Sequence, residues 1–267
     1  MKTMILDNNI DNIRLYDQLG IDRIFVDLEI IGKVARQGGM DTVISDHSLD
    51  DIKKIKPLLS GTQLLVRVNP IHSNSVMEIT QSIENGADIV MLPMFKTVAE
   101  VASFVRIVDK RAVACILLET SEALCRIDDI LEIEGIDEIH IGLNDLHLSL
   151  GLDFMFELLG CDLIEFLTKK IRNKNIPFGI GGVGRMDHGM LNGRAIMIEH
   201  VRLGSSMVIL SRSFKGNGQV SIEDIQYELL KLQQVVLNAM TLSDSLLLEN
   251  KSTLKKITNQ IATKLRG

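Results

Sequence analysis

The stretch AVACILL at residues 112–118 decides the fold class, because it is apolar at every position and is followed by an acid, Glu119. A run this short and this rich in branched side chains predicts a β-strand that is buried on both faces. Such strands belong to parallel sheets whose two faces are covered by helices. The stretch therefore predicts an α/β protein in which helices connect parallel strands.

The same pattern recurs on both sides of this stretch. Short apolar runs predict strands at residues 3–6, 23–27, 63–68, 89–92, 112–118, 138–142, 177–181 and 206–210. Segments with helical periodicity lie between them, near residues 8–19, 49–59, 74–85, 97–109, 121–132, 153–173 and 192–203. Eight strands that alternate with helices predict a (β/α)8 barrel, or TIM barrel, which forms a single domain of ~250 residues.

The C-terminal segment contains more helix than a barrel requires. We expect a catalytic barrel domain over residues 1–220 and a C-terminal helical extension over residues 221–267, because two helical patterns remain after the eighth strand. The apolar face of the second pattern, from Leu246 to Leu265, requires a partner. It either covers the floor of the barrel or packs on a neighbouring subunit.

Composition excludes several classes of protein. The chain has 267 residues, 46% of them hydrophobic, and a net charge of -6, which indicates a soluble globular protein rather than a nucleic-acid-binding one. No apolar run reaches the ~18 residues of a membrane helix, and acids and amides follow the start too closely for a signal peptide. We expect a cytoplasmic protein with no membrane partner. The three cysteines lack the spacing of a zinc site or a disulfide framework.

Polar residues just after the predicted strands are the candidates for the active site, since barrel enzymes place it at the carboxyl ends of their strands. Glu119 and Asp145 follow consecutive strands. Their carboxylates are expected to converge on one hard divalent cation, Mg²⁺ or Mn²⁺. Alternatively, each caps a helix or pairs with an arginine. The buried strands before both acids favour the metal site, because an unpaired charge there would be costly.

Arg67 leaves an otherwise apolar strand in LLVRVNP. It either pairs with an acid of the core or presents its planar guanidinium to a carboxylate substrate. A metal on one side and Arg67 on the other would suit a 2-oxo acid, because together they stabilise the enolate that forms when a carbon-carbon bond breaks. Asp27 and Glu29 are expected to orient water on the metal, and Asn69 to contact the substrate.

Three further candidates come from loops. GIGGVG at residues 179–184 matches a dinucleotide-binding motif, but it follows the seventh strand and no long apolar helix opens after it. We expect its backbone at Gly181 and Gly182 to bind an anion, together with Arg212 after the eighth strand, unless the glycines only permit a tight turn. His47 precedes a helix with Ser48 as its cap and is either a general base or a solvated loop histidine.

Several motifs, in order and at barrel spacing, resemble the HpcH/HpaI aldolase and citrate lyase beta-subunit family. They are FVDLE at 25–29, LVRVNP at 65–70, GADIVMLPM at 86–94, LLET at 117–120 and IGLNDL at 141–146. The resemblance implies a metal-dependent barrel that cleaves or forms carbon-carbon bonds, with Glu119 and Asp145 as metal ligands and Arg67 as the arginine that binds the substrate and stabilises the enolate. It also implies a homo-oligomer, because members commonly exchange C-terminal helices.

One departure affects the proton transfer that the resemblance implies. The pyruvate aldolases of the family carry a histidine after the acid of the strand-two motif, whereas this chain reads Asp27-Leu28-Glu29-Ile30. We therefore predict a metal-dependent lyase or aldolase for a 2-oxo acid, with His47 as a replacement base. The alternatives are a citryl- or malyl-coenzyme A type lyase, and a barrel that has lost catalysis and serves as a binding or assembly subunit.

Overall fold

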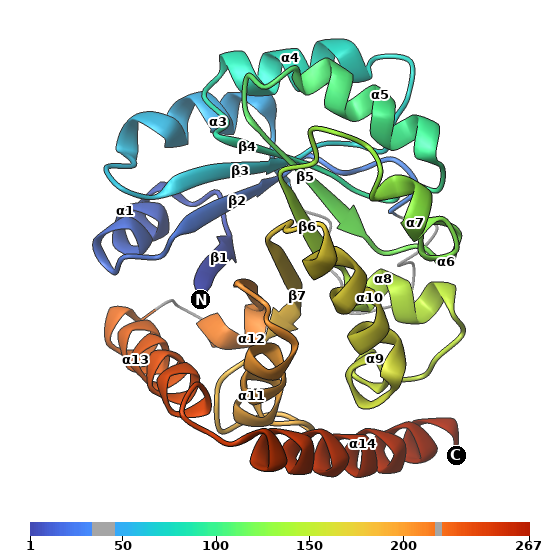
Figure 1. The fold of residues 1–267 in the computed structure, drawn as a ribbon. Coiled ribbons are helices and arrows are strands. Elements are labelled where there is room, and N and C mark those ends of the chain that lie inside the picture. Colours follow the sequence, from blue (N-terminus) through green and yellow to red (C-terminus); the bar gives the residue numbers. More distant parts are fainter. Residues whose placement is uncertain (34–45, 217–220) are drawn as a thin grey trace. The chain divides into compact units, whose positions relative to one another are not determined.

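Eight parallel strands in sequence order form a closed barrel. The computed structural model describes residues 1–33, 46–216 and 221–267 (Figure 1). The strands are β1 (Lys2–Leu6), β2 (Arg23–Asp27), β3 (Gln63–Arg67), β4 (Ile89–Leu92), β5 (Val113–Leu118), β6 (Glu138–Ile141), β7 (Phe178–Val183) and β8 (Met207–Leu210). The predicted (β/α)8 fold is confirmed, and each predicted strand has a counterpart.

Helices connect the strands as the periodicity predicts. They are α1 (Ile10–Gln18), α3 (Leu49–Ile55), the 3-10 helix η1 (Lys56–Leu58), α4 (Ser75–Glu84), α5 (Val98–Val108), α6 (Ser121–Leu124), α7 (Ile127–Ile130), α8 (Leu143–Ser149), α9 (Glu157–Gly160), α10 (Asp162–Asn173), α11 (Gly193–Leu203), α12 (Arg212–Lys215), α13 (Ile222–Ala239) and α14 (Asp244–Arg266). None of the helices in the described part of the chain is long and apolar enough to cross a membrane.

Two predicted helices are each divided into two. The pattern over residues 121–132 forms α6 and α7, and the pattern over residues 153–173 forms α9 and α10. The second division lies at Gly160 and Cys161, where the backbone of Cys161 is extended. A Cβ at Gly160 would lie 2.6 Å from the hydroxyl of Thr258 in α14, so the close approach of α14 requires glycine here.

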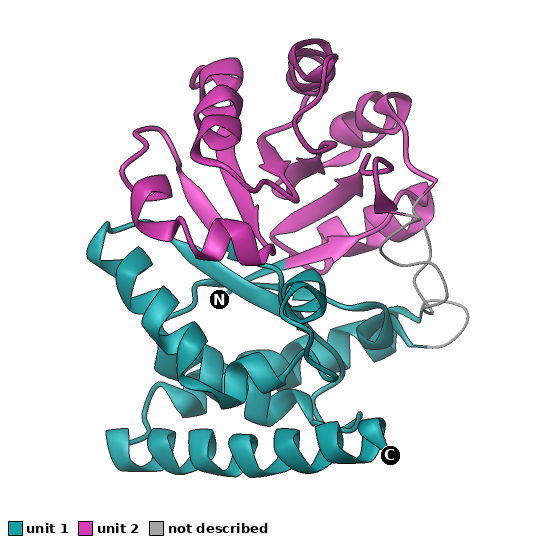
Figure 2. Ribbon diagram, turned by 90° about the vertical axis from the view of Figure 1, so that its right-hand side faces the viewer, with its two compact units in different colours: residues 1–3, 140–267 teal, residues 4–139 magenta. Residues whose placement is uncertain are grey.

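Two compact units make up the chain, Met4–Ile139 and Met1–Thr3 with His140–Gly267 (Figure 2). In the unit Met4–Ile139, strands β2 to β5 pair in parallel, and α3, α4 and α5 pack on this part of the sheet. The strand residues of its core are branched and fully buried, as in Ile24, Val66 and Val90. This burial confirms the inference from continuous apolar strands.

The other unit contains β7, β8 and the C-terminal helices. Strand β7 extends to Val183, so the expectation that it ends at residue 181 is wrong: Gly182 still pairs with Ile209, after a register shift that begins at Gly179. Helix α14 packs on α9 and α11 of its own chain (Figure 1). The predicted boundary between the barrel domain and the C-terminal extension, after residue 220, adjoins the segment 217–220, which lies outside the described residues.

Candidate functional site

The centre of the candidate site is an ion pair between the last residues of two neighbouring strands. Strands β2 and β3 pair in a register that places Asp27 beside Arg67. Asp27 Oδ1 accepts from Arg67 Nε at 2.8 Å, and Asp27 Oδ2 accepts from Arg67 Nη2 at 2.7 Å. The guanidinium also lies 5.4 Å from the ring centre of Phe25, two residues before Asp27. Register and packing therefore hold one edge of the guanidinium in place.

Asp27 is saturated with donors. Besides Arg67, the ammonium of Lys33 donates to Oδ2 at 2.5 Å and the backbone N–H of Glu29 to Oδ1 at 3.2 Å. Burial raises the pKa of this carboxyl, but the charges and hydrogen bonds of Arg67 and Lys33 outweigh it and hold the pKa well below its ordinary value. Asp27 is therefore an ionised anchor for two cations, since a carboxylate offers about four acceptor positions.

Arg67 is surrounded by acids. Its side chain is 14% exposed, and its Nε lies 3.4 Å from Glu29 Oε2. Burial lowers the pKa of Arg67, but Asp27, Glu29 and Glu119 together raise it above its ordinary value. The guanidinium is thus permanently charged and largely shielded from water, the state in which it interacts most strongly with an anion.

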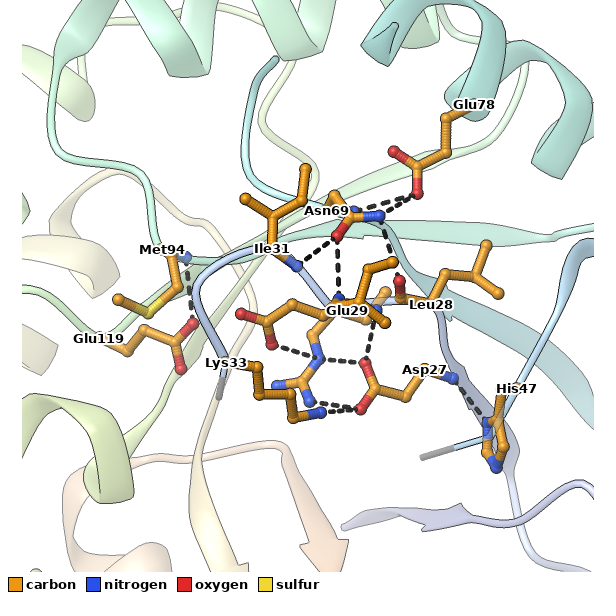
Figure 3. A network of polar contacts seen from close by, with 12 residues as sticks. Asp27, Leu28, Glu29, Ile31, Lys33, His47, Asn69, Glu78, Met94 and Glu119 are labelled. Carbon is orange, nitrogen blue, oxygen red and sulfur yellow. Dashed lines mark hydrogen bonds and ion pairs between the residues drawn. The ribbon is translucent and has the colours of Figure 1, made fainter. Parts of the chain in front are cut away.

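Asn69 clamps the loop that follows β2. Its Oδ1 accepts the backbone N–H groups of Ile30 and Ile31, and its Nδ2 donates to the carbonyl of Leu28 and to Glu78 (Figure 3). Four partners use all the positions of one amide. These contacts give Asn69 a positioning role in the loop after β2, and its predicted contact with the substrate stays a prediction.

Glu119 follows β5 directly and is 3% exposed. Its Oε1 accepts the backbone N–H of Met94 at 3.1 Å (Figure 3). Met94 has a φ of 52°, a left-handed conformation that is strained for a residue other than glycine. This backbone conformation turns the N–H of Met94 toward the carboxylate of Glu119 and fixes the orientation of that carboxylate.

His47 lies just before α3, and Ser48 caps that helix as predicted, in a capping box with Asp51. The backbone N–H of Asp27 donates to His47 Nδ1 at 2.9 Å. Nδ1 is therefore unprotonated, and the neutral ring carries its proton on Nε2. Burial lowers the pKa of His47, which the acids Asp27, Asp51 and Asp7 offset only in part. This tautomer is a donor at Nε2 and has no lone pair there to act as a base.

The remaining predicted residues belong to the other unit. Asp145 follows β6 as predicted and lies in the first turn of α8, and Arg212 is exposed at the start of α12. Gly181 has a φ of 44°, and its carbonyl oxygen lies 2.9 Å from His140 Nε2. Gly181 and Gly182 therefore belong to a strand and its bulge rather than to a loop.

The donors at this site fit a hard divalent cation. Among the described residues, no three side chains of histidine, cysteine or acids form a metal cluster by themselves. Mg²⁺ does not require one, since one or two carboxylates with substrate and water oxygens are its usual ligands. The oriented carboxylate of Glu119 is a donor of this kind.

Sequence reasoning missed two residues of the site. Lys33 was not among the predicted residues, although it lies in the loop after β2, on the same side of the barrel as the other candidates. Met94 acts through its backbone, so its residue type carries no signal. Both contribute contacts to the acids that sequence reasoning had selected.

Solved structures share this fold at low identity. An HpcH/HpaI aldolase from Desulfitobacterium hafniense DCB-2 is 16% identical, with a TM-score of 0.63 over 91% of this chain and 94% of that one. An HpcH/HpaI aldolase/citrate lyase family protein from Burkholderia cenocepacia J2315 is 13% identical, with a TM-score of 0.62 over 90% and 95%. Citrate synthase SbnG is 15% identical, with a TM-score of 0.61 over 87% and 93%.

The sequence comparison identifies the family. No curated protein matches the chain. The profile of the HpcH/HpaI aldolase/citrate lyase family matches residues 8–156, a range that includes Asp27, Arg67, Glu119 and Asp145. Because this match spans more than half of the sequence, the chain belongs to the HpcH/HpaI aldolase/citrate lyase family.

Proposed function

We propose that this protein is a divalent-metal-dependent carbon-carbon lyase or aldolase that acts on a 2-oxo acid through its enolate. The family supports lyase chemistry. The observation that carries the proposal is the guanidinium of Arg67, which is buried, anchored by Asp27 and within electrostatic reach of Glu119. A fixed cation beside an oriented carboxylate is the arrangement that an enolate and its metal require.

Arg67 binds the substrate with the part of its guanidinium that Asp27 does not use. Nε and one N–H of Nη2 are bound to Asp27, so the N–H groups of Nη1 and the second N–H of Nη2 remain for a carboxylate or an enolate oxygen. Because Asp27 holds the group in place before the substrate arrives, little reorganisation is needed as negative charge develops.

The metal would be held by Glu119, with Asp145 as the second ligand predicted from the sequence. When bound, Mg²⁺ or Mn²⁺ supplies Lewis-acid stabilisation of negative charge on the substrate oxygens. Met94 orients the carboxylate of Glu119, and Glu29 contributes negative charge near Arg67. Asp27 anchors Arg67 through both carboxylate oxygens.

Exchange of the pyruvate methyl hydrogens in D₂O tests this function without knowledge of the acceptor, because an enolate must form for exchange to occur. Proton NMR should show exchange with Mg²⁺ present and none after chelation. The same assay on the methyl group of acetyl-coenzyme A distinguishes this function from that of a citryl- or malyl-coenzyme A type lyase, for which the acetyl methyl hydrogens would exchange instead. If neither methyl group exchanges above the rate in buffer with Mg²⁺ or Mn²⁺, the proposal is wrong.

Calorimetric titration with Mg²⁺ tests the ligands directly. Glu119→Gln and Asp145→Asn should each weaken metal binding. Glu122→Gln is the matched control, because Glu122 is a nearby acid whose side chain is 41% exposed and paired with Lys96. Unchanged affinity in both site variants would remove these residues from the metal site.

A further inference from the structure

Lys33 is a buried charged group that the proposed function does not use. Its side chain is 5% exposed, and its ammonium contacts Asp27 Oδ2 (Figure 3). Among residues 1–33, 46–216 and 221–267, Asp27 is the only acceptor of this ammonium. An ammonium carries three hydrogens, so two of them have no acceptor in that part of the chain. A buried donor without an acceptor is costly, which indicates that a ligand completes the group.

Neutralisation of Asp27 does not account for Lys33. Arg67 already places one N–H on each oxygen of that carboxylate, and the backbone N–H of Glu29 adds a third donor. A second buried cation would add little to the ionisation of Asp27 and would itself lose its hydration. The position of Lys33 therefore calls for a second negative group.

Lys33 and Arg67 meet on a single oxygen atom. Lys33 Nζ lies 2.5 Å and Arg67 Nη2 lies 2.7 Å from Asp27 Oδ2, so the two nitrogens are no more than about 5 Å apart. Two like charges at this distance repel each other. A carboxylate that accepts from both nitrogens relieves the repulsion and uses the donors that Asp27 leaves over.

The charge of the site depends on the metal. With the predicted metal ligand Asp145 included, the acids Asp27, Glu29, Glu119 and Asp145 and the cations Arg67 and Lys33 carry a formal net charge of about -2, which a divalent cation would change to about 0. Without Lys33 the site with its metal would carry a net charge of about -1 and would oppose the binding of a carboxylate.

We propose, on the basis of the proposed function, that Lys33 is the second cationic ligand of the substrate carboxylate and shares it with Arg67. This assignment makes Lys33 a determinant of specificity. It selects 2-oxo acids over neutral carbonyl compounds, because only an acid brings the charge that the two cations require.

Calorimetric titration of oxalate, in the presence of saturating Mg²⁺, tests this assignment. Lys33→Met should weaken oxalate binding about 10- to 100-fold, the usual loss for a hydrogen bond to a charged group. Lys231→Met is the matched control, since Lys231 shares Asp187 with Arg194 as Lys33 shares Asp27 with Arg67, but on an exposed carboxylate. This control should bind oxalate like the wild type. If Lys33→Met does not fold, Lys33→Gln keeps a donor for Asp27 and removes the charge.

Three results would overturn the assignment. The first is an oxalate affinity of Lys33→Met within threefold of the wild type, and the second is no binding of oxalate by the wild type. The third is a loss of oxalate affinity no larger than the loss of Mg²⁺ affinity that the same variant shows without oxalate. The proposed function fails separately. Lys33-dependent oxalate binding without exchange of the pyruvate methyl group would support the inference and refute the function, whereas normal exchange with unchanged oxalate binding would do the reverse.

Discussion

Replacement of Asp27 by asparagine removes one charge from the centre of the site and leaves its shape nearly unchanged. The side chain of Asp27 is fully buried and binds two cations, Arg67 and Lys33. Loss of one partner of a buried ion pair costs about 3–5 kcal/mol, because the remaining charge stays buried without compensation. Against a total stability of about 5–15 kcal/mol for a domain, this is a large fraction.

Asp187→Asn is the matched control for this variant. Asp187 also binds one arginine and one lysine, Arg194 and Lys231, but its side chain is 40% exposed. Water hydrates the two cations there when the carboxylate is removed, so the urea midpoint of this variant should be close to that of the wild type. The two substitutions are chemically identical, and burial is the main difference between them.

Urea unfolding followed by circular dichroism measures both variants. The chain has no tryptophan, so its far-ultraviolet signal is the suitable probe. Asp27 has a pKa below its unfolded value of 3.8, so its contribution is fully present above pH 4 and is lost as the pH falls through the lower folded pKa. The urea midpoints of Asp27→Asn and Asp187→Asn should therefore differ by the same amount at pH 8 and at pH 6. Equal shifts for Asp27→Asn and Asp187→Asn, or a loss below about 1 kcal/mol for Asp27→Asn, would refute the reasoning.

Three further predictions concern catalysis, acid stability and assembly. Arg67→Lys should keep the fold and lower turnover on the true substrate by about 10² to 10³, since the ammonium lacks the planar set of donors; turnover near that of the wild type would make Arg67 structural. Burial lowers the pKa of His200 from 6.5 to about 3, so the imidazole stays neutral in the native state while the unfolded state binds a proton as the pH falls through 6.5. The native state therefore loses stability over this pH range. Between pH 7 and pH 5, the free energy of unfolding measured with urea should therefore fall by about 2 kcal/mol less in His200→Leu than in the wild type. The same fall in both proteins would contradict this. Leu248 and Leu265 of α14 are 54% and 52% exposed, and the predicted oligomer would bury them against a neighbouring subunit. The double variant Leu248→Lys, Leu265→Lys should therefore have a lower assembly mass in light scattering than the wild type. An unchanged mass would exclude this contact.

Truncation of α14 would be a poorer test of assembly than these surface substitutions. Leu254, Thr258 and Ala262 of this helix are buried within its own unit, where α14 packs on α9 and α11, whereas Leu248 and Leu265 stay exposed. Removal of the whole helix would expose α9 and α11 as well. The oligomer remains a prediction from the sequence.

The order of the strands and the residue types at their carboxyl ends follow from the sequence alone. Continuous apolar runs such as residues 112–118 have one stable environment, a sheet covered on both faces, and eight of them in alternation with helices leave the barrel as the simplest closed solution. Local signals also sufficed for the cap of α3 at Ser48. These features depend on neighbours in the chain, which the sequence displays directly.

The roles of the site residues depend on tertiary contacts. Sequence reasoning weighed two roles for Arg67, and the structure shows that it pairs with an acid 40 positions away in the chain, because the register of β2 and β3 places Asp27 beside it. The backbone N–H of Asp27 likewise determines the tautomer of His47, and the path of the loop after β2 returns Lys33 to the same carboxylate. Registers and loop paths are set by packing among distant segments, so the sequence identified most residues of this site but not Lys33 or Met94, and only the folded chain assigned their partners.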